Sequence, residues 1–185
     1  MPRTAVTHLI SNVDKTAVTG VQLKNNEQLT ANFVIDASSL GSRTPKWLSD
    51  LNYERPAESS VNIGLNYTSR LYEKPEHLPD WTALVIYPKA PQQNRMGYIF
   101  PVEGDRWLVT LASYLDDSKP TDEDSFLAFA RSLPHPDVYN AIQTTKPVSG
   151  LTAYYTPKEI RRHYEKLTRF PDGLVVMGDA AQLVR

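Results

Sequence analysis

A short apolar run near the C-terminus most constrains how this chain can fold. Leu174–Met177 lies between Pro171–Gly173 and Gly178, a pattern typical of a strand that is covered on both faces. Asp179 and Ala180 follow directly. A glycine lets a ligand approach the backbone closely, and a carboxylate accepts hydrogen bonds from hydroxyl groups. Because open α/β sheets bind ligands at the carboxyl ends of their strands, we expect a ligand site here.

A second segment has the same form. Val34–Asp36 is an apolar run that ends in an acid, and Ala37–Arg43 is a turn of small residues closed by a cation. Two strand ends of this kind predict one shared cleft, bordered by Asp36 and Asp179. The alternative is that Asp179 only caps a helix after a core strand, which requires no ligand.

Composition excludes several classes of function. The chain has 185 residues, enough for one domain or pieces of two, and 20 basic against 21 acidic side chains, a net charge of -1. This balance gives no electrostatic reason to bind nucleic acid or an anionic membrane. The basic tract Lys158–Arg169 is interrupted by Glu159 and Glu165 and predicts a solvated face. No apolar stretch matches a bilayer and no secretory signal is evident, so we expect a cytoplasmic protein.

Metal and thiol chemistry are not expected either. The sequence contains no cysteine, which excludes disulfides, thiolate nucleophiles and cysteine-ligated metals. The 4 histidines are scattered without the spacing of a ligand set. We therefore predict no metal site.

The first part of the chain predicts a β-meander followed by a short helix. Three strands are expected over Thr4–Ser11, Ala17–Leu23 and Leu29–Asp36, with the last one ending at the first of the two acids. Pro45 suits the first turn of a helix, which we expect over Lys46–Leu51.

The middle of the chain predicts an antiparallel sheet and one main helix. β-Branched and aromatic residues are enriched in four segments. These are Val61–Leu71, Thr82–Tyr87, Met96–Pro101 and Trp107–Tyr114. The main helix is expected over Thr121–Leu133, with Thr121 as its N-cap, and a short helix over Val138–Thr144. The charges and aromatic residues of Lys158–Arg169 fit neither the helical nor the strand period, and we expect this segment to be helical or irregular.

Together these elements predict an α+β chain. Residues 1–55 and 156–185 would share one sheet of a nucleotide-binding type, and residues 56–155 would form a second, β-rich sheet.

Several segments resemble a known family. Val34–Ser38, Gly41–Leu48 and Phe170–Ala180 are similar to the later FAD-binding motifs of the FAD-dependent oxidoreductases related to para-hydroxybenzoate hydroxylase. Between them, Gly97–Gly104 and Arg106–Leu111 resemble the substrate-domain sheet of the same flavoproteins.

The resemblance implies a partial FAD-binding domain over 1–55 and 156–185 and a substrate-binding sheet over 56–155. The parent enzyme would be a flavin monooxygenase or a reductase that acts on a small organic substrate, with the flavin performing the redox chemistry. Asp179 would bind a ribityl hydroxyl of FAD, and Arg43 would pair with a phosphate or with a neighbouring carboxylate. The implied cofactor-binding residues are Asp36, Gly41, Ser42, Arg43, Gly178, Asp179 and Ala180; the resemblance assigns no catalytic residue.

The chain also departs from this family. It contains no Gly-x-Gly-x-x-Gly turn, which in the family receives the FAD pyrophosphate, and the family continues well beyond the second aspartate. We therefore expect an incomplete fragment that binds FAD weakly or not at all. It would be either an inert binding module or a piece completed by a separate chain that carries the glycine-rich unit. The second alternative predicts an exposed apolar sheet edge beside Ile35 and Val175.

Overall fold

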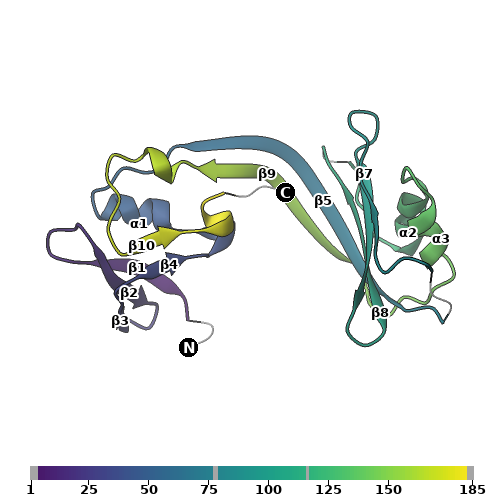
Figure 1. Cartoon of the computed structure of the whole chain (residues 1–185), viewed down its shortest axis with the longest axis horizontal. Coiled ribbons are helices and arrows are strands. Elements are labelled where there is room, and N and C mark those ends of the chain that lie inside the picture. Colours follow the sequence, from purple (N-terminus) through teal and green to yellow (C-terminus); the bar gives the residue numbers. More distant parts are fainter. Residues whose placement is uncertain (1–3, 77–78, 116, 183–185) are drawn as a thin grey trace. The chain divides into compact units, whose positions relative to one another are not determined.

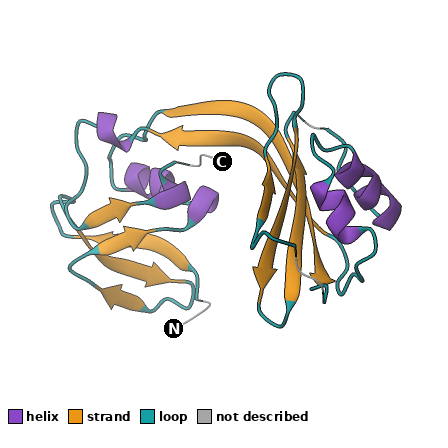
Figure 2. Cartoon of the chain, turned by 45° about the vertical axis from the view of Figure 1, so that its right-hand side comes forward, coloured by secondary structure: helices purple, strands orange, loops and turns teal. Residues whose placement is uncertain are grey.

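The computed structural model describes residues 4–76, 79–115 and 117–182, and the chain separates into two compact units (Figure 1). Unit 1 comprises residues 1–61 and 159–185, and unit 2 comprises residues 62–158. The predicted α+β class is confirmed: more residues lie in strands than in helices, and the helices are few and short (Figure 2).

The first sheet of unit 1 is antiparallel and consists of β1 (Val6–Ser11), β2 (Val18–Leu23) and β3 (Gln28–Thr30). The expected third strand, Leu29–Asp36, was wrong as a continuous element. After β3, the Ala31 amide still donates to Thr19 O of β2 at 2.9 Å, and the chain then leaves this sheet. Period-two reasoning could not detect this break, because both halves are strands that belong to different sheets.

The second sheet of unit 1 has two parallel strands, β4 (Val34–Asp36) and β10 (Leu174–Val176). Leu174 is buried, but Ile35 is 55% and Val175 39% exposed. The prediction that the C-terminal strand is covered on both faces is therefore wrong, since no element of the described chain covers its second face.

A small core and a short helix stabilise unit 1. α1 (Thr44–Asp50) starts with Pro45 in its first turn and buries Trp47 and Leu48. These two side chains pack with residues from the sheets and from the loop after α1, namely Leu9, Val18, Tyr53 and Leu174. Three 3-10 turns complete the unit: η1 (Ser39–Gly41), η2 (Tyr164–Lys166) and η3 (Gly178–Ala180).

The sheet of unit 2 has the strand order β6-β7-β8-β5-β9. Its strands are β5 (Glu58–Glu73), β6 (Leu84–Ile86), β7 (Arg95–Val102), β8 (Arg106–Ser113) and β9 (Thr152–Arg162), and β5, β8, β7 and β6 pair antiparallel as expected. β5 begins and β9 ends within unit 1. β9 corrects the expectation for the first part of Lys158–Arg169, up to Arg162: its polar sequence lacks the apolar alternation of a strand because most of its side chains are exposed. The rest of that tract holds η2 and is otherwise irregular, as expected.

Two helices lie against one face of this sheet (Figure 2). α2 (Glu123–Arg131) and α3 (Asp137–Ile142) bury Phe126 and Val138 against the strands. The N-cap of α2 is Asp122, and the expectation of Thr121 was wrong. Asp122 accepts a bond from the Ser125 amide at 2.8 Å, and Ser125 Oγ accepts one from the Asp122 amide at 3.0 Å. This reciprocal capping box satisfies two orphan donors at once.

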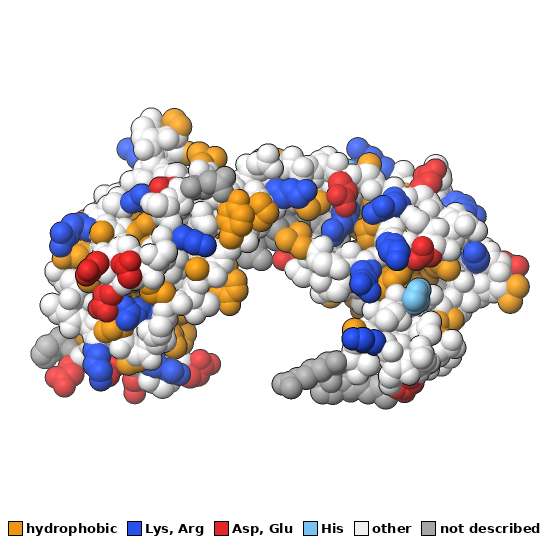
Figure 3. Space-filling view, turned by 180° about the vertical axis from the view of Figure 1, so that it is seen from behind, with side chains coloured by type: hydrophobic (Ala, Val, Ile, Leu, Met, Phe, Trp, Pro, Cys, Tyr) orange, Lys and Arg blue, Asp and Glu red, His pale blue; other side chains and the backbone are white. Residues whose placement is uncertain are grey.

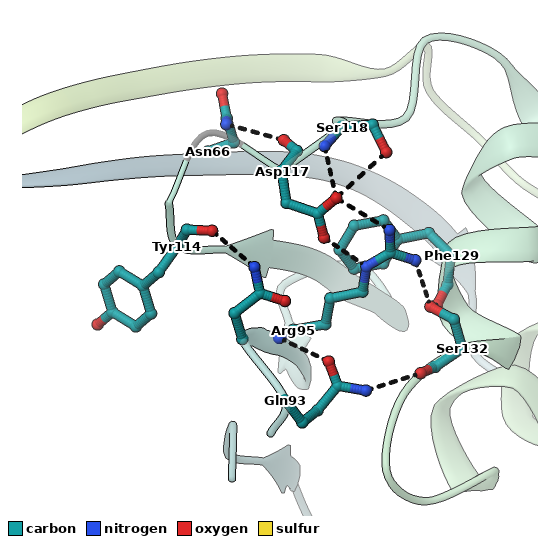
Figure 4. Close-up of polar contacts among 9 residues, drawn as sticks. Asn66, Gln93, Arg95, Tyr114, Asp117, Ser118, Phe129 and Ser132 are labelled. Atoms are coloured by element: carbon teal, nitrogen blue, oxygen red, sulfur yellow. Dashed lines mark hydrogen bonds and ion pairs between the residues drawn. The ribbon is translucent and has the colours of Figure 1, made fainter. Parts of the chain in front are cut away.

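Arg95 connects the sheet to α2 (Figure 4). Its Nε and Nη2 donate to the two Asp117 oxygens at 2.6 and 3.1 Å, and its Nη1 donates to Ser132 Oγ at 2.7 Å. The guanidinium also lies 4.5 Å from the centroid of the Phe129 ring. The hydrogen bonds from Arg95 keep the pKa of Asp117 below its usual value. One side chain therefore connects the start of β7, the segment after β8 and the end of α2.

None of the helices within the described ranges is long and apolar enough to cross a membrane. On the face drawn in Figure 3, basic and acidic side chains are interspersed over both units.

Candidate functional site

The structure brings the two predicted strand ends together within unit 1. Because β4 and β10 are adjacent and parallel, their carboxyl ends lie at the same edge. The Met177 amide donates to Asp36 O at 3.0 Å, and Ser39 Oγ lies 3.4 Å from Asp179 Oδ2. Residues that are 140 positions apart in the sequence therefore form one edge, built from the turns η1 and η3.

Asp36 organises the first of these turns. Asp36 is 7% exposed, and its carboxylate accepts bonds from Ser38 N at 2.9 Å and from Ser38 Oγ, Ser42 Oγ and Thr44 Oγ1 at 2.5 Å each. Burial raises the pKa of Asp36, but the hydroxyl and amide donors outweigh this effect and the net shift is downward. The Asp36 carboxylate is thus ionised and is used by its own loop, so its predicted role near the cofactor would be to position the loop.

Arg162 connects the two turns, and sequence reasoning missed it. This side chain ends β9 and is 9% exposed. Its Nη1 donates to Ala180 O at 2.8 Å, its Nη2 to Leu40 O at 3.1 Å and its Nε to Glu58 Oε1 at 3.1 Å. The expectation that the tract around it is simply a solvated face was wrong for Arg162. No local pattern distinguishes it from Arg161, because its three partners lie far away in the sequence or across a turn.

Tyr164 in η2 is partly buried and packs against the core of unit 1. Burial raises its pKa to about 12, and Arg162 opposes this shift. Its hydroxyl forms no hydrogen bond of good geometry among the described residues, although Ser42 is near enough to lower the pKa slightly. The Ser42 hydroxyl donates to Asp36 instead.

The remaining predicted residues divide into accessible and structural ones. Gly178 has φ +59°, and a Cβ built there would have no heavy atom within 4 Å apart from its chain neighbours; the same space is open at Gly41. Arg43 is exposed, and its carbonyl accepts bonds from the Lys46 and Trp47 amides. Its guanidinium has no recorded hydrogen bond or ion pair with another described residue, and Asp179 is half-buried. Ala180, by contrast, is fully buried.

An apolar surface borders this edge. The side chains on the second face of β4 and β10 and beside it are substantially exposed: Phe33 54%, Ile35 55%, Val175 39% and Met177 50%. A hollow of about 470 Å³ lies next to β4 and is lined by apolar side chains together with Asp36, Ala37 and Ser38. The edge of the sheet therefore combines polar loops with an uncovered apolar face.

Comparison with known proteins gives the fold of the chain. No family model matches it. Protein Rv3254 of Mycobacterium tuberculosis (strain ATCC 25618 / H37Rv) is 31% identical over 161 residues, which are 87% of this chain and 34% of that protein. The chain thus spans about a third of the length of this curated relative.

Solved structures with a similar fold include flavin-dependent enzymes. The flavin-dependent brominase Bmp2 matches 98% of this chain with 44% of its own, at a TM-score of 0.67 and 16% identity. The protein pqsL, a probable FAD-dependent monooxygenase from Pseudomonas aeruginosa, matches 98% of the chain with 47% of its own, at 0.64 and 14% identity. A flavoprotein/dehydrogenase from Cytophaga hutchinsonii matches 98% of this chain with 42% of its own, at a TM-score of 0.62 and 15% identity. The fold of this chain is therefore one that flavin-dependent monooxygenases and halogenases share.

Proposed function

We propose that this chain supplies part of the FAD cleft and the substrate sheet of a flavin-dependent oxidoreductase, of the monooxygenase or reductase type. The observation that carries the proposal is the meeting of η1 and η3 at the carboxyl ends of two adjacent parallel strands. This is the place where α/β sheets bind their ligands.

The residues at this edge fit an extended, hydroxylated and phosphorylated cofactor in part. The open space over Gly41 and Gly178 would let the cofactor lie against the backbone. Asp179 would accept bonds from ribityl hydroxyls, and the exposed Arg43 would pair with a phosphate. Asp36, Ser42 and Ala180 would hold the turns in place through their bonds to one another and to Arg162. A bound flavin would supply the redox chemistry, and these residues would bind and orient it.

The face of the unit 2 sheet that α2 and α3 do not cover is suited to a small, largely apolar substrate. Tyr98 and Phe100 on β7 stack with ring centroids 6.3 Å apart. Burial raises the pKa of Tyr98, and the nearby hydroxyls of Tyr114, Tyr87 and Tyr67 raise it further. These rings form an uncharged face with hydroxyl groups, which is suited to ring-containing molecules.

FAD titration tests the cofactor proposal. Quenching of flavin fluorescence by the full chain measures the Kd, and FAD at a hundred times the Kd should stabilise the fold by about 2.7 kcal/mol. Asp179→Ala and Arg43→Gln should each weaken binding by about tenfold or more. Asp172→Ala is the control, because Asp172 is an exposed acid of unit 1 whose recorded bonds use the backbone: the Val18 amide donates to its carbonyl at 2.8 Å, and its amide donates to Thr16 O at 3.0 Å. Equal Kd values for Asp179→Ala and wild type would contradict the assignment.

The alternative is an inert binding module that keeps the fold without the cofactor. It predicts no quenching and no thermal shift at any FAD concentration.

The exposed apolar face at Ile35 and Val175 favours a third arrangement. In it, residues outside these 185 cover this face and carry the glycine-rich turn. Co-expression with such a unit, on the same or a separate chain, should then restore tight FAD binding, and Ile35→Glu should prevent it.

A further inference from the structure

A second group of reactive side chains lies in unit 1, outside the proposed cleft. Ser59 is near the start of β5, His163 follows β9, and Glu165 is in η2. Ser59 Oγ lies 2.8 Å from His163 Nε2, and His163 Nδ1 lies 2.9 Å from Glu165 Oε1. A hydroxyl, an imidazole and a carboxylate therefore form one continuous line of hydrogen bonds.

The backbone holds these three residues in place. The His163 amide donates to Ala57 O at 2.9 Å, which fixes the histidine beside the start of β5. The Lys166 amide donates to His163 O at 3.1 Å and closes the turn that carries Glu165. Arg161 Nη2 lies 3.0 Å from Glu165 Oε1 and keeps the carboxylate at the histidine. The arrangement therefore does not depend on one flexible side chain.

The chemistry of the partners fixes the direction of each bond. The hydrogen bond from His163 is the main cause that lowers the pKa of Glu165 to about 2, so this side chain is ionised at neutral pH and can only accept. Nδ1 of His163 must then carry a proton. In the neutral ring Nε2 keeps its lone pair, so Ser59 donates its hydroxyl proton to Nε2. The serine proton thus points at a base that a third group orients.

We propose that Ser59, His163 and Glu165 form a hydrolytic site for activated carboxylic esters, an activity that is independent of the flavin proposal. Ser59 is the nucleophile, His163 the general base and acid, and Glu165 a positioning residue. Ser59 is exposed and His163 retains 12% exposure of its side chain, so an ester can reach the serine oxygen.

The reaction balances with water as the second reactant. Ser59 Oγ attacks the ester carbonyl carbon while its proton moves to His163 Nε2. The bond from carbon to the alcohol oxygen then breaks, and His163 returns the proton to the leaving alcohol. A water molecule attacks the acyl carbon and gives a proton to His163 Nε2; the carboxylic acid leaves, and the proton restores the serine hydroxyl.

Esterase kinetics and active-site labelling test the proposal on the full chain without FAD. General-base catalysis by a positioned side chain accelerates a reaction by roughly 10²–10⁴-fold. We choose p-nitrophenyl acetate as the substrate, because its good leaving group lets an acceleration of this size be measured. We expect hydrolysis with an initial burst, and a fluorophosphonate probe should modify the peptide that contains Ser59. Ser59→Ala and His163→Asn should each lower the rate by about tenfold or more. Glu165→Gln should lower kcat and leave KM unchanged, because this residue acts through the histidine.

Matched controls separate the site from general surface reactivity. Ser60→Ala removes the neighbouring exposed serine, and His135→Gln removes an exposed histidine. Both should keep the wild-type rate. Labelling of wild type at Ser59 requires no variant, so it decides the question even if a variant fails to fold. Absence of that label, labelling at another residue, or an unchanged rate in Ser59→Ala would overturn the proposal. The rate should not change when FAD is added, so failure of either proposal leaves the other intact.

Discussion

The two units differ in how their sheets are covered. In unit 2, α2 and α3 lie on one face, and beneath them Ile99, Val109 and Leu111 have no exposed surface. In unit 1, one face of the β4–β10 pair packs on the core through Leu174, while Ile35 and Val175 on the other face are open. Unit 2 thus buries its main apolar face with its own helices, whereas unit 1 leaves apolar surface for something else to cover.

This difference separates stability from ligand binding. A face that is covered by its own helices gains free energy from burial at roughly 25 cal/mol per Å². The open face of unit 1 gains nothing of this kind, and its turns are held by polar contacts instead, through Asp36 and Arg162. Variants in unit 2 should therefore act on folding, and variants at the edge of unit 1 should act mainly on local order and binding.

Truncation in the core of unit 2 should have the largest effect. Phe126 is fully buried and packs against Tyr72 with ring centroids 6.3 Å apart. Phe126→Ala should cost about 3–5 kcal/mol of unfolding free energy, because it removes a buried ring and leaves a cavity. Ile35→Thr, a β-branched replacement on the open face of unit 1, should stay within about 0.5 kcal/mol. Urea denaturation followed by hydrogen exchange separates the units, and similar losses in both variants would break the comparison.

Removal of Arg162 should have the next largest effect, confined to unit 1. Arg162→Ala leaves Leu40 O, Ala180 O and Glu58 without their donor and should cost about 2–3 kcal/mol. The matched control is Arg161→Ala, which removes the ion pair between Arg161 and Glu165. Both of these side chains are 51% exposed, so the pair contributes less than about 1 kcal/mol to stability. Hydrogen exchange should speed up in η1 and η3 and stay unchanged in unit 2. Uniform acceleration in both units would show that Arg162 does not act locally.

The sequence predicted those parts of the fold that depend on local pattern. Strands β5 to β8 follow from β-branched and aromatic enrichment, and α2 follows from one apolar helix face around Phe126. The pairing of two apolar runs that each end in an acid also predicted that Asp36 and Asp179 lie at one edge. Both inferences use information within a few residues of each position.

The parts that the sequence did not predict depend on distant partners. The break between β3 and β4 arises because Val34 pairs with Leu174, which no local period records. The role of Arg162 depends on carbonyls of two separate turns, and Ser59 and His163 are 104 positions apart. The prediction that both faces of the strand at Val175 are covered was wrong, because an apolar sequence shows that a strand face favours burial but does not show which residues bury it.

Asp36 should make the stability of unit 1 depend on pH. Its folded pKa lies below the ordinary value of 3.8, so its contribution is complete above that value and is lost as the pH falls through the lowered folded pKa. Asp36→Asn should cost about 1–2 kcal/mol at pH 6, where the hydroxyls of Ser42 and Thr44 lose their charged acceptor. The difference from wild type should shrink below about pH 4. Urea midpoints at several pH values measure it, and a constant difference would contradict an ionised Asp36.

The smallest expected effect compares two glycines at the same edge. Gly178 has φ +59°, so Gly178→Ala should cost about 1 kcal/mol from the left-handed backbone alone, since its Cβ would meet open space. Gly41 faces open space too but has no positive φ, so Gly41→Ala should change stability by less than about 0.5 kcal/mol. If a cofactor lies against this edge, both variants should weaken FAD binding by more than their effect on stability. Thermal unfolding with and without FAD measures both quantities; a Gly178→Ala variant with an unchanged Kd would mean that the backbone there is not approached by the cofactor.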